Sequence, residues 1–127
     1  MQIFSWRNAG LAIVFLWFFG GGITHFTDPD FFVNIMPDWL PWHLALVYIS
    51  GVFEIAGALG ILLPRTRQLA GTCLFILTIC VTPVNIHMWL NPQLFPDVSE
   101  LFLSLRLVIQ AILLAIIWFS TRDPKTA

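Results

Sequence analysis

The chain has 127 residues, of which 58% are hydrophobic and 10% are charged, and its formal net charge is −1. Soluble domains carry about 25% charged residues, so this composition argues against a soluble protein and predicts a membrane protein. The small net charge gives no electrostatic reason to expect nucleic acid as a partner. The length accommodates one domain, taken as residues 1–127.

Four apolar runs are long enough to cross a bilayer, which requires about 20 residues in a helix. In chain order they cover residues 8–26, 42–63, 69–90 and 101–119. The connections between them are residues 27–41, 64–68 and 91–100. The sequence therefore predicts an all-α integral membrane protein, a bundle of four transmembrane helices.

Outside these runs, basic and acidic residues lie in different parts of the chain. Five of the six basic residues lie near the N-terminus, in the second connection or in the C-terminal tail: Arg7, Arg65, Arg67, Arg122 and Lys125. The other two connections carry only acidic residues: Asp28, Asp30, Asp38, Asp97 and Glu100. The positive-inside rule then places both termini in the cytoplasm and the acidic connections outside. We expect a multi-pass protein of the cell inner (cytoplasmic) membrane.

Ionisable residues inside a transmembrane helix are costly to insert, so each one is a candidate functional residue. Glu54 lies close to the midpoint of the second run, and Arg106 lies in the outer part of the fourth. Helical spacing places Ser50 one turn from Glu54 and Gln110 one turn from Arg106. Each run thus has a polar stripe, which we expect to face inward, away from lipid.

The predicted topology brings the polar residues of all four runs to overlapping depths. We expect them to line a pocket that opens toward the outer face, and the candidate ligand-binding residues are His25, Ser50, Glu54, Asn85, His87, Arg106 and Gln110. Two other interpretations remain open. Glu54 and Arg106 could form a structural ion pair that locks the bundle, and the polar stripe of the third run could serve only interhelical hydrogen bonds.

Several short stretches resemble the DoxX-like membrane proteins. They are Gly21-Gly-Ile-Thr-His-Phe26, Pro37, Leu40-Pro41, Ser50-Gly-Val-Phe-Glu-Ile55, Leu62-Leu-Pro-Arg-Thr-Arg67, Pro83-Val-Asn-Ile86 and Leu105-Arg-Leu-Val-Ile-Gln110. The resemblance covers nearly the whole chain and departs from the family pattern at Val84, where a small residue is usual. It implies a four-helix membrane protein whose polar positions are His25, Glu54, Asn85, Arg106 and Gln110.

The resemblance also implies a choice of functions, because DoxX-like proteins include members linked to quinone-dependent sulfur oxidation, members linked to oxidative stress and animal chaperones of receptor assembly. The first hypothesis is a module that binds an amphipathic small molecule, a quinone or a lipid, including as a subunit of a redox system. The second is a membrane assembly or interaction protein whose polar core is only structural. Transport is a weaker third, because the chain is small and has no inverted repeat that we detect.

The sequence contains no nucleophile–base pair, no glycine-rich phosphate loop and no metal-ligand spacing, so no catalytic residue and no metal are predicted. An independent enzyme is not expected. Quinone is the one cofactor that the first hypothesis implies. The expected partners are the lipid bilayer, a quinone or lipid ligand, and a membrane protein partner or a second copy of the chain.

Overall fold

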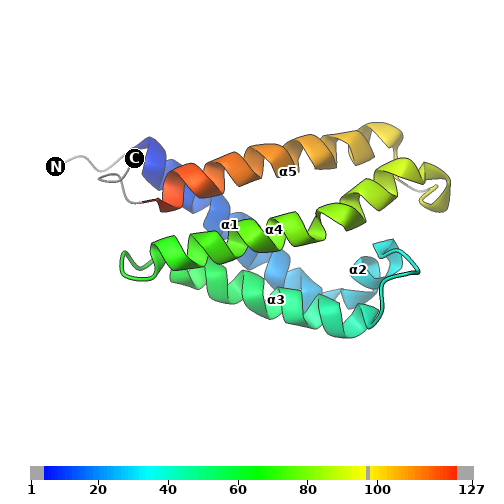
Figure 1. Ribbon diagram of the computed structural model, residues 1–127, viewed down its shortest axis with the longest axis horizontal. Helices are drawn as coiled ribbons and strands as arrows, with labels where there is room; N and C mark the ends of the chain where they lie inside the picture. The colour runs from blue at the N-terminus through cyan, green and yellow to red at the C-terminus, as the bar shows by residue number, and fades with distance from the viewer. Residues whose placement is uncertain (1–4, 97, 123–127) are drawn as a thin grey trace.

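The computed structural model describes residues 5–96 and 98–122. In chain order its elements are α1 (Trp6–Thr27), α2 (Pro29–Ile35), α3 (His43–Gly60), α4 (Arg67–Leu90), the short 3-10 helix η1 (Pro92–Leu94) and α5 (Glu100–Thr121), and these described ranges contain no strand. The helices α1, α3, α4 and α5 are each long and apolar enough to cross a membrane. The predicted all-α bundle with four helices able to cross a membrane is confirmed, and this suggests a multi-pass membrane protein (Figure 1).

The predicted spans 8–26, 42–63, 69–90 and 101–119 agree with the four long helices to within three residues at each end. Two of these helices are preceded by a serine that caps their first turn. The hydroxyl of Ser5 accepts a hydrogen bond from the backbone N–H of Asn8, and the hydroxyl of Ser99 accepts one from that of Phe102. Such caps satisfy N–H groups that the first turn of a helix leaves free.

The connection 27–41 is expected from the sequence to be a loop, but it contains α2. Pro29 occupies the first turn, where its missing N–H costs nothing, and Asp30 lies at the positive end of the helix dipole. The helix has only seven residues, too few for apolar periodicity to distinguish it from a loop. It lies at the end of the bundle opposite the start of α1 (Figure 1).

One half of the bundle, which we call the closed half, has an apolar core, with the hydroxyls of Ser120 and Thr121 buried at its end. Its core is the cluster Leu11, Val14, Phe18, Ala58, Ile61, Leu74, Leu113 and Ile117. Small residues allow the helices to approach one another there. A Cβ added at Gly10 would lie 3.0 Å from Cβ of Ser120, and one added at Gly71 would overlap Thr121. This close approach is typical of helix pairs in membranes.

Arginines hold the end of the closed half at which α1 begins and α5 ends. Arg7 donates to the backbone oxygens of Ser120 and Arg122, at 3.0 and 2.8 Å. Arg122 in turn donates to the backbone oxygen of Gln68 at 2.7 Å, and Arg67 donates to that of Ile61 at 2.7 Å. The basic residues that the sequence groups together therefore lie at one end of the bundle. Two residues of the charge pattern, Asp97 and Lys125, lie outside the described residues.

The other half, which we call the pocket half, is built from two helix pairs. In Figure 1 the ends of α4 and α5 diverge there from those of α1 and α3, and α2 lies on the side of α3. The gap is bridged at its end by a second apolar cluster, in which Ile35 of α2 packs with Met88 of α4 and Leu103 of α5. The space between the two apolar clusters is the candidate site.

Candidate functional site

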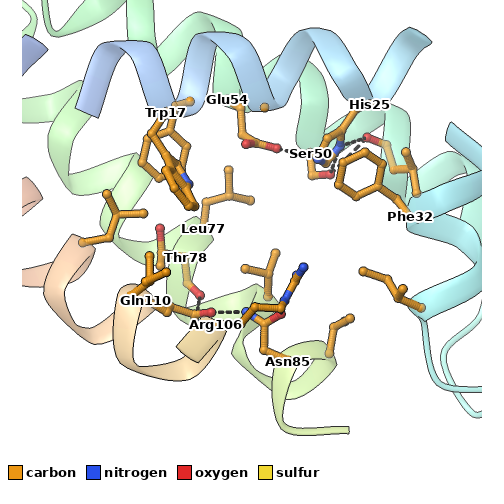
Figure 2. Close-up of a pocket in the computed structure, with 18 of the residues that line it drawn as sticks. Trp17, His25, Phe32, Ser50, Glu54, Leu77, Thr78, Asn85, Arg106 and Gln110 are labelled. Carbon is orange, nitrogen blue, oxygen red and sulfur yellow. Dashed lines mark hydrogen bonds and ion pairs between the residues drawn. The ribbon is translucent and has the colours of Figure 1, made fainter. Parts of the chain in front are cut away.

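A cavity of about 500 Å³ lies in the pocket half, lined by residues of α1 to α5 and the segments beside them. Its size falls within the range of pockets that hold small molecules. Six of the seven polar residues predicted from the sequence line it: His25, Ser50, Glu54, Asn85, Arg106 and Gln110. Figure 2 shows that they form two facing walls, one on α1 and α3 and the other on α4 and α5.

The α1–α3 wall is organised around His25. Its Nε2 lies 2.8 Å from Oε2 of Glu54, and both side chains are nearly buried. Its Nδ1 lies 2.7 Å from the backbone oxygen of Val47 and 3.0 Å from the hydroxyl of Ser50. The imidazole therefore has a polar partner at each ring nitrogen, and its orientation is fixed.

Hydrogen-bond accounting assigns protons to this wall. The carbonyl of Val47 can only accept, so Nδ1 of His25 carries a hydrogen. The short contact between Nε2 and Glu54 then requires one more proton between them, on either the imidazole or the carboxyl group. In both arrangements the His25–Glu54 pair has no net charge. It is a proton-sharing pair inside a transmembrane span.

Glycines bring α1 and α3 close enough for this pair to form. A Cβ added at Gly51 would lie 2.8 Å from Cβ of His25, and one added at Gly22 would lie 3.0 Å from the backbone oxygen of Gly51. A Cβ added at Gly21 would lie 3.1 Å from Oε1 of Glu54. Gly21 and Gly22 of the glycine triplet, together with Gly51, therefore determine how closely the two helices of this wall pack.

The short helix α2 covers the α1–α3 wall. The ring of Phe32 lies on the imidazole of His25, with centroids 4.0 Å apart and planes tilted by 38°. Phe31, Ile35 and Met36 also line the pocket. These apolar residues were not predicted as part of the site, because the connection 27–41 was expected to be a loop. Two adjacent phenylalanines after a proline, beside an acidic residue, were the available signal for a short amphipathic helix.

The α4–α5 wall carries a fixed cation. Arg106 donates to Oδ1 of Asn85 through Nη2 at 2.9 Å and through Nε at 3.3 Å. Asn85 donates to Oε1 of Gln110, and the amide nitrogen of Gln110 donates to the backbone oxygen of Thr78 at 3.0 Å and to the hydroxyl of Thr82. This chain of neutral amides and hydroxyls orients the guanidinium, which points into the space between the walls (Figure 2).

The two walls do not neutralise each other. Glu54 pairs with His25, and Arg106 bonds to Asn85, so these described residues form no Glu54–Arg106 ion pair. The interpretation of these two charges as a direct lock across the bundle is therefore wrong. The polar stripe of α4 does form interhelical hydrogen bonds, because the hydroxyl of Thr82 and the amide of Asn85 bond to Gln110 of α5, as does the backbone oxygen of Thr78. Asn85 and Gln110 nevertheless line the cavity as well.

His87 is the predicted site residue that does not line the pocket. Its Nδ1 lies 3.4 Å from Nδ2 of Asn91, and its ring meets the ring of Phe95 edge-on, with centroids 6.1 Å apart. Residues two positions apart in an α-helix differ by about 200° of rotation about the helix axis, so His87 cannot share the face of Asn85. The structure places it at the end of α4, near η1.

Apolar side chains form a rim where the pocket meets the surface. Four of the lining residues are large, apolar and 40–51% exposed, namely Trp17, Phe31, Phe102 and Ile109. They come from α1, α2 and α5, three of the elements that line the cavity. Tryptophan in membrane proteins concentrates near the interfaces, whereas Trp17 lies in the middle of α1. The polar walls are therefore reached past an apolar rim on the flank of the bundle.

Chemically, the site combines a fixed cation, a shared proton and a free acceptor. No described residue donates to Oε1 of Glu54, which leaves that oxygen available to a hydroxyl or amine in the cavity. Among the described residues no group of three or more His, Cys, Asp or Glu side chains could hold a metal ion. The arrangement suits the binding of a polar head group and the movement of one proton.

The fold and the site together define a helical membrane protein with four spans and a polar pocket in one half. The chain belongs to the family described as domain of unknown function DUF8561, whose model matches residues 11–121. The match includes every residue that lines the pocket. No curated protein and no solved structure matches the chain.

Proposed function

We propose that this protein binds an amphipathic small molecule, a quinone or a lipid, with its head group between the two polar walls. The observation that carries the proposal is the convergence of six polar side chains on one cavity inside four apolar spans. Intramembrane ionisable residues are costly to keep and are retained mostly where they act on a ligand or an ion. The apolar rim supports an occupant whose chain extends toward the bilayer.

The charge distribution supports an orientation for the pocket. The end of the bundle held by Arg7, Arg67 and Arg122 would face the cytoplasm under the positive-inside rule. Both termini would then be cytoplasmic, and the pocket half would face outward from the cell inner membrane. A ligand would enter from the outer leaflet of that membrane.

The resemblance to DoxX-like proteins supports quinone as one member of the ligand class. A quinone oxygen could accept from Arg106 and exchange a proton with the His25–Glu54 pair. In that form of the proposal the protein is a subunit of a redox system, and a partner supplies the electrons. DoxX-like membership is itself part of the proposal, whereas membership of DUF8561 is shown.

A second candidate function, assembly of or interaction with another membrane protein, is favoured by a separate surface. Trp39 and Trp42 lie between α2 and α3 and are 69% and 77% exposed. Trp42 is also held at φ 54, a left-handed conformation that is unusual for a residue with a Cβ. In this alternative the polar walls only hold the bundle, and substitutions in 36–42 would abolish function while pocket substitutions would not.

Extraction and mass spectrometry of the purified full-length chain test the proposal. We expect a retained amphipath in the organic extract, in an amount comparable to that of the protein and enriched over bulk lipid. Val81→Phe should reduce it strongly, because Val81 lines the cavity and the larger ring would narrow the space between the walls. Ile79→Phe is the matched control, since Ile79 lies two residues away on α4, is 49% exposed and does not line the cavity.

Two results would contradict ligand binding at this site. The first is an extract of the wild-type chain that matches bulk lipid in composition. The second is an enriched compound that Val81→Phe and Ile79→Phe retain equally. Suppose that either result is obtained and that substitution of Trp39 or Trp42 abolishes the binding of a stoichiometric membrane partner. Assembly would then replace ligand binding as the proposed function.

A further inference from the structure

The hydrogen bonds of Arg106 leave much of its guanidinium group unused. A guanidinium has five N–H donors. Only Nε and Nη2 have a partner among the described residues, and that partner is a single neutral oxygen, Oδ1 of Asn85. The ring of Phe102 lies 5.9 Å from the guanidinium carbon. Nη1 therefore points its two donors at no protein acceptor in the described part of the chain.

Among the residues that the structure describes, Glu54 is the only carboxylate lining the pocket, and it cannot balance this charge. Glu54 is committed to His25 through Oε2, and the pair has no net charge wherever the shared proton lies. No other ionisable side chain lines the pocket among the described residues. With Arg106 at +1 and the pair at zero, the walls carry a net charge of +1.

We propose that the head group held in this pocket is an oxyanion, a carboxylate or a phosphate, bound to Arg106. This inference rests on the proposed binding function and narrows its ligand class. An oxyanion would supply the acceptors that Nη1 and the remaining N–H of Nη2 lack, in the two-point geometry that guanidinium forms with carboxylates and phosphates. A positive charge in an apolar span is best balanced by an anion, and here that anion would carry its own hydrocarbon tail.

The surroundings of Arg106 fit a head group whose hydrocarbon chain extends toward the bilayer. The exposed ring of Phe102 lies one turn before Arg106 on α5, and exposed Ile109 lies one turn after it. Trp17 of α1 and Phe31 of α2 complete the rim of the same cavity. A chain that leaves the pocket past these side chains meets apolar surface. The oxyanion stays inside with Arg106.

A series of single-chain amphipaths that differ only in the head group tests this inference. Palmitate, palmityl phosphate, palmityl alcohol and palmitylamine are each titrated onto the full-length protein in nonionic micelles, and bound copies are counted by native mass spectrometry. We expect palmitate or palmityl phosphate to bind roughly tenfold more tightly than the alcohol, the ratio given by one charge-assisted hydrogen bond. The better of the two shows whether a carboxylate or a phosphate is preferred. The amine should bind most weakly.

Variants of two arginines locate the source of the preference. Arg106→Gln should reduce the ratio of anion to alcohol affinity to about one, and Arg106→Lys should keep part of it, because the charge remains without the two-point geometry. Arg65→Gln is the control, since Arg65 is exposed in the connection between α3 and α4. Its ratio should equal that of the wild type if attraction to surface charge plays no part.

Equal binding of the anions and the alcohol by the wild type would overturn the oxyanion inference, as would an anion preference that survives Arg106→Gln. A neutral quinone that binds as tightly as palmitate would also overturn it. All three results leave the binding function intact, because a ligand still occupies the pocket. If no member of the series and no quinone binds, the proposed function itself fails.

Discussion

The two walls of the pocket keep charged groups inside the membrane by opposite means. On the α1–α3 wall Glu54 has a partner, His25, that cancels its charge within the protein. On the α4–α5 wall Arg106 is bonded only to the neutral side chain of Asn85. An uncompensated arginine at the centre of a span costs about 2.5–3.5 kcal/mol on insertion scales. The first wall is thus complete without a ligand, and the second is not.

The same cavity therefore contains polar side chains that stabilise the fold and a polar side chain that is available to a ligand. The α1–α3 wall is fixed by tight glycine packing and by hydrogen bonds at both nitrogens of His25. The α4–α5 wall is fixed by the amides of Asn85 and Gln110, which orient the arginine without neutralising it. Substitutions in the first wall should therefore act mainly on stability. Substitutions at Arg106 should act mainly on what the pocket binds.

The largest expected effect breaks the first wall at its backbone. Gly51→Ala would place a Cβ 2.8 Å from Cβ of His25 and 2.9 Å from Cε2 of Phe26, so α1 and α3 must move apart. We expect a loss of about 1–3 kcal/mol in unfolding free energy, as for other overpacked contacts, measured by denaturant titration in mixed micelles. The control is Gly20→Ala, since nothing lies within 4 Å of a Cβ there.

Gly20→Ala should leave stability unchanged or raise it by up to about 1 kcal/mol, because alanine is the better helix former. Equal losses of stability for Gly51→Ala and Gly20→Ala would show that α1 and α3 do not pack closely at Gly51. The proton-sharing pair would then have no structural basis in the glycine packing.

Substitutions at Glu54, with an effect equal to or smaller than that of Gly51→Ala, test the pair itself. Glu54→Leu leaves Nε2 of His25 without a partner, and the free energy of unfolding should fall by about 1–3 kcal/mol, the cost of an unsatisfied buried polar group. Glu54→Gln should cost less than half of that, because its amide N–H can donate to Nε2 while Nδ1 keeps its hydrogen. The same denaturant titration measures both variants.

Equal losses for Glu54→Leu and Glu54→Gln would mean that the hydrogen bond to His25 does not stabilise the bundle. Because both substitutions remove the carboxylate, equal losses would instead assign the stability to its negative charge, which Arg106 would then sense across the cavity. That outcome would remove the contrast between the two walls.

The sequence predicts the four spans and most of the pocket because the relevant signals are long or periodic. Each span is a run of about 20 apolar residues, and Glu54 and Arg106 stand out inside such runs. Helical spacing then places Ser50 and Gln110 on the same faces as these charges. The structure brings all four side chains to one cavity.

The partners within the pocket could not be predicted in the same way. The sequence offers Arg106 as the obvious counterion for Glu54, but pairing depends on which helices are neighbours and how closely they approach. Close packing at Gly51 brings His25 to Glu54, and no periodicity encodes that distance. The covering ring of Phe32 was also missed, because α2 is too short for an apolar pattern to identify it.

Fluorescence of Trp17 tests the central claim, an occupant held between the two walls, most directly. The protein is prepared with its other five tryptophans replaced by phenylalanine and titrated with a fatty acid brominated along its chain. Trp17 lies on the rim, so bromine in a bound chain should quench it in a saturable way, and unlabelled fatty acid should reverse the quenching. Val81→Phe should abolish the saturable part. Quenching that rises without saturation, is not reversed and is unchanged in Val81→Phe would contradict the claim, because Trp17 would then sense only the surrounding bilayer.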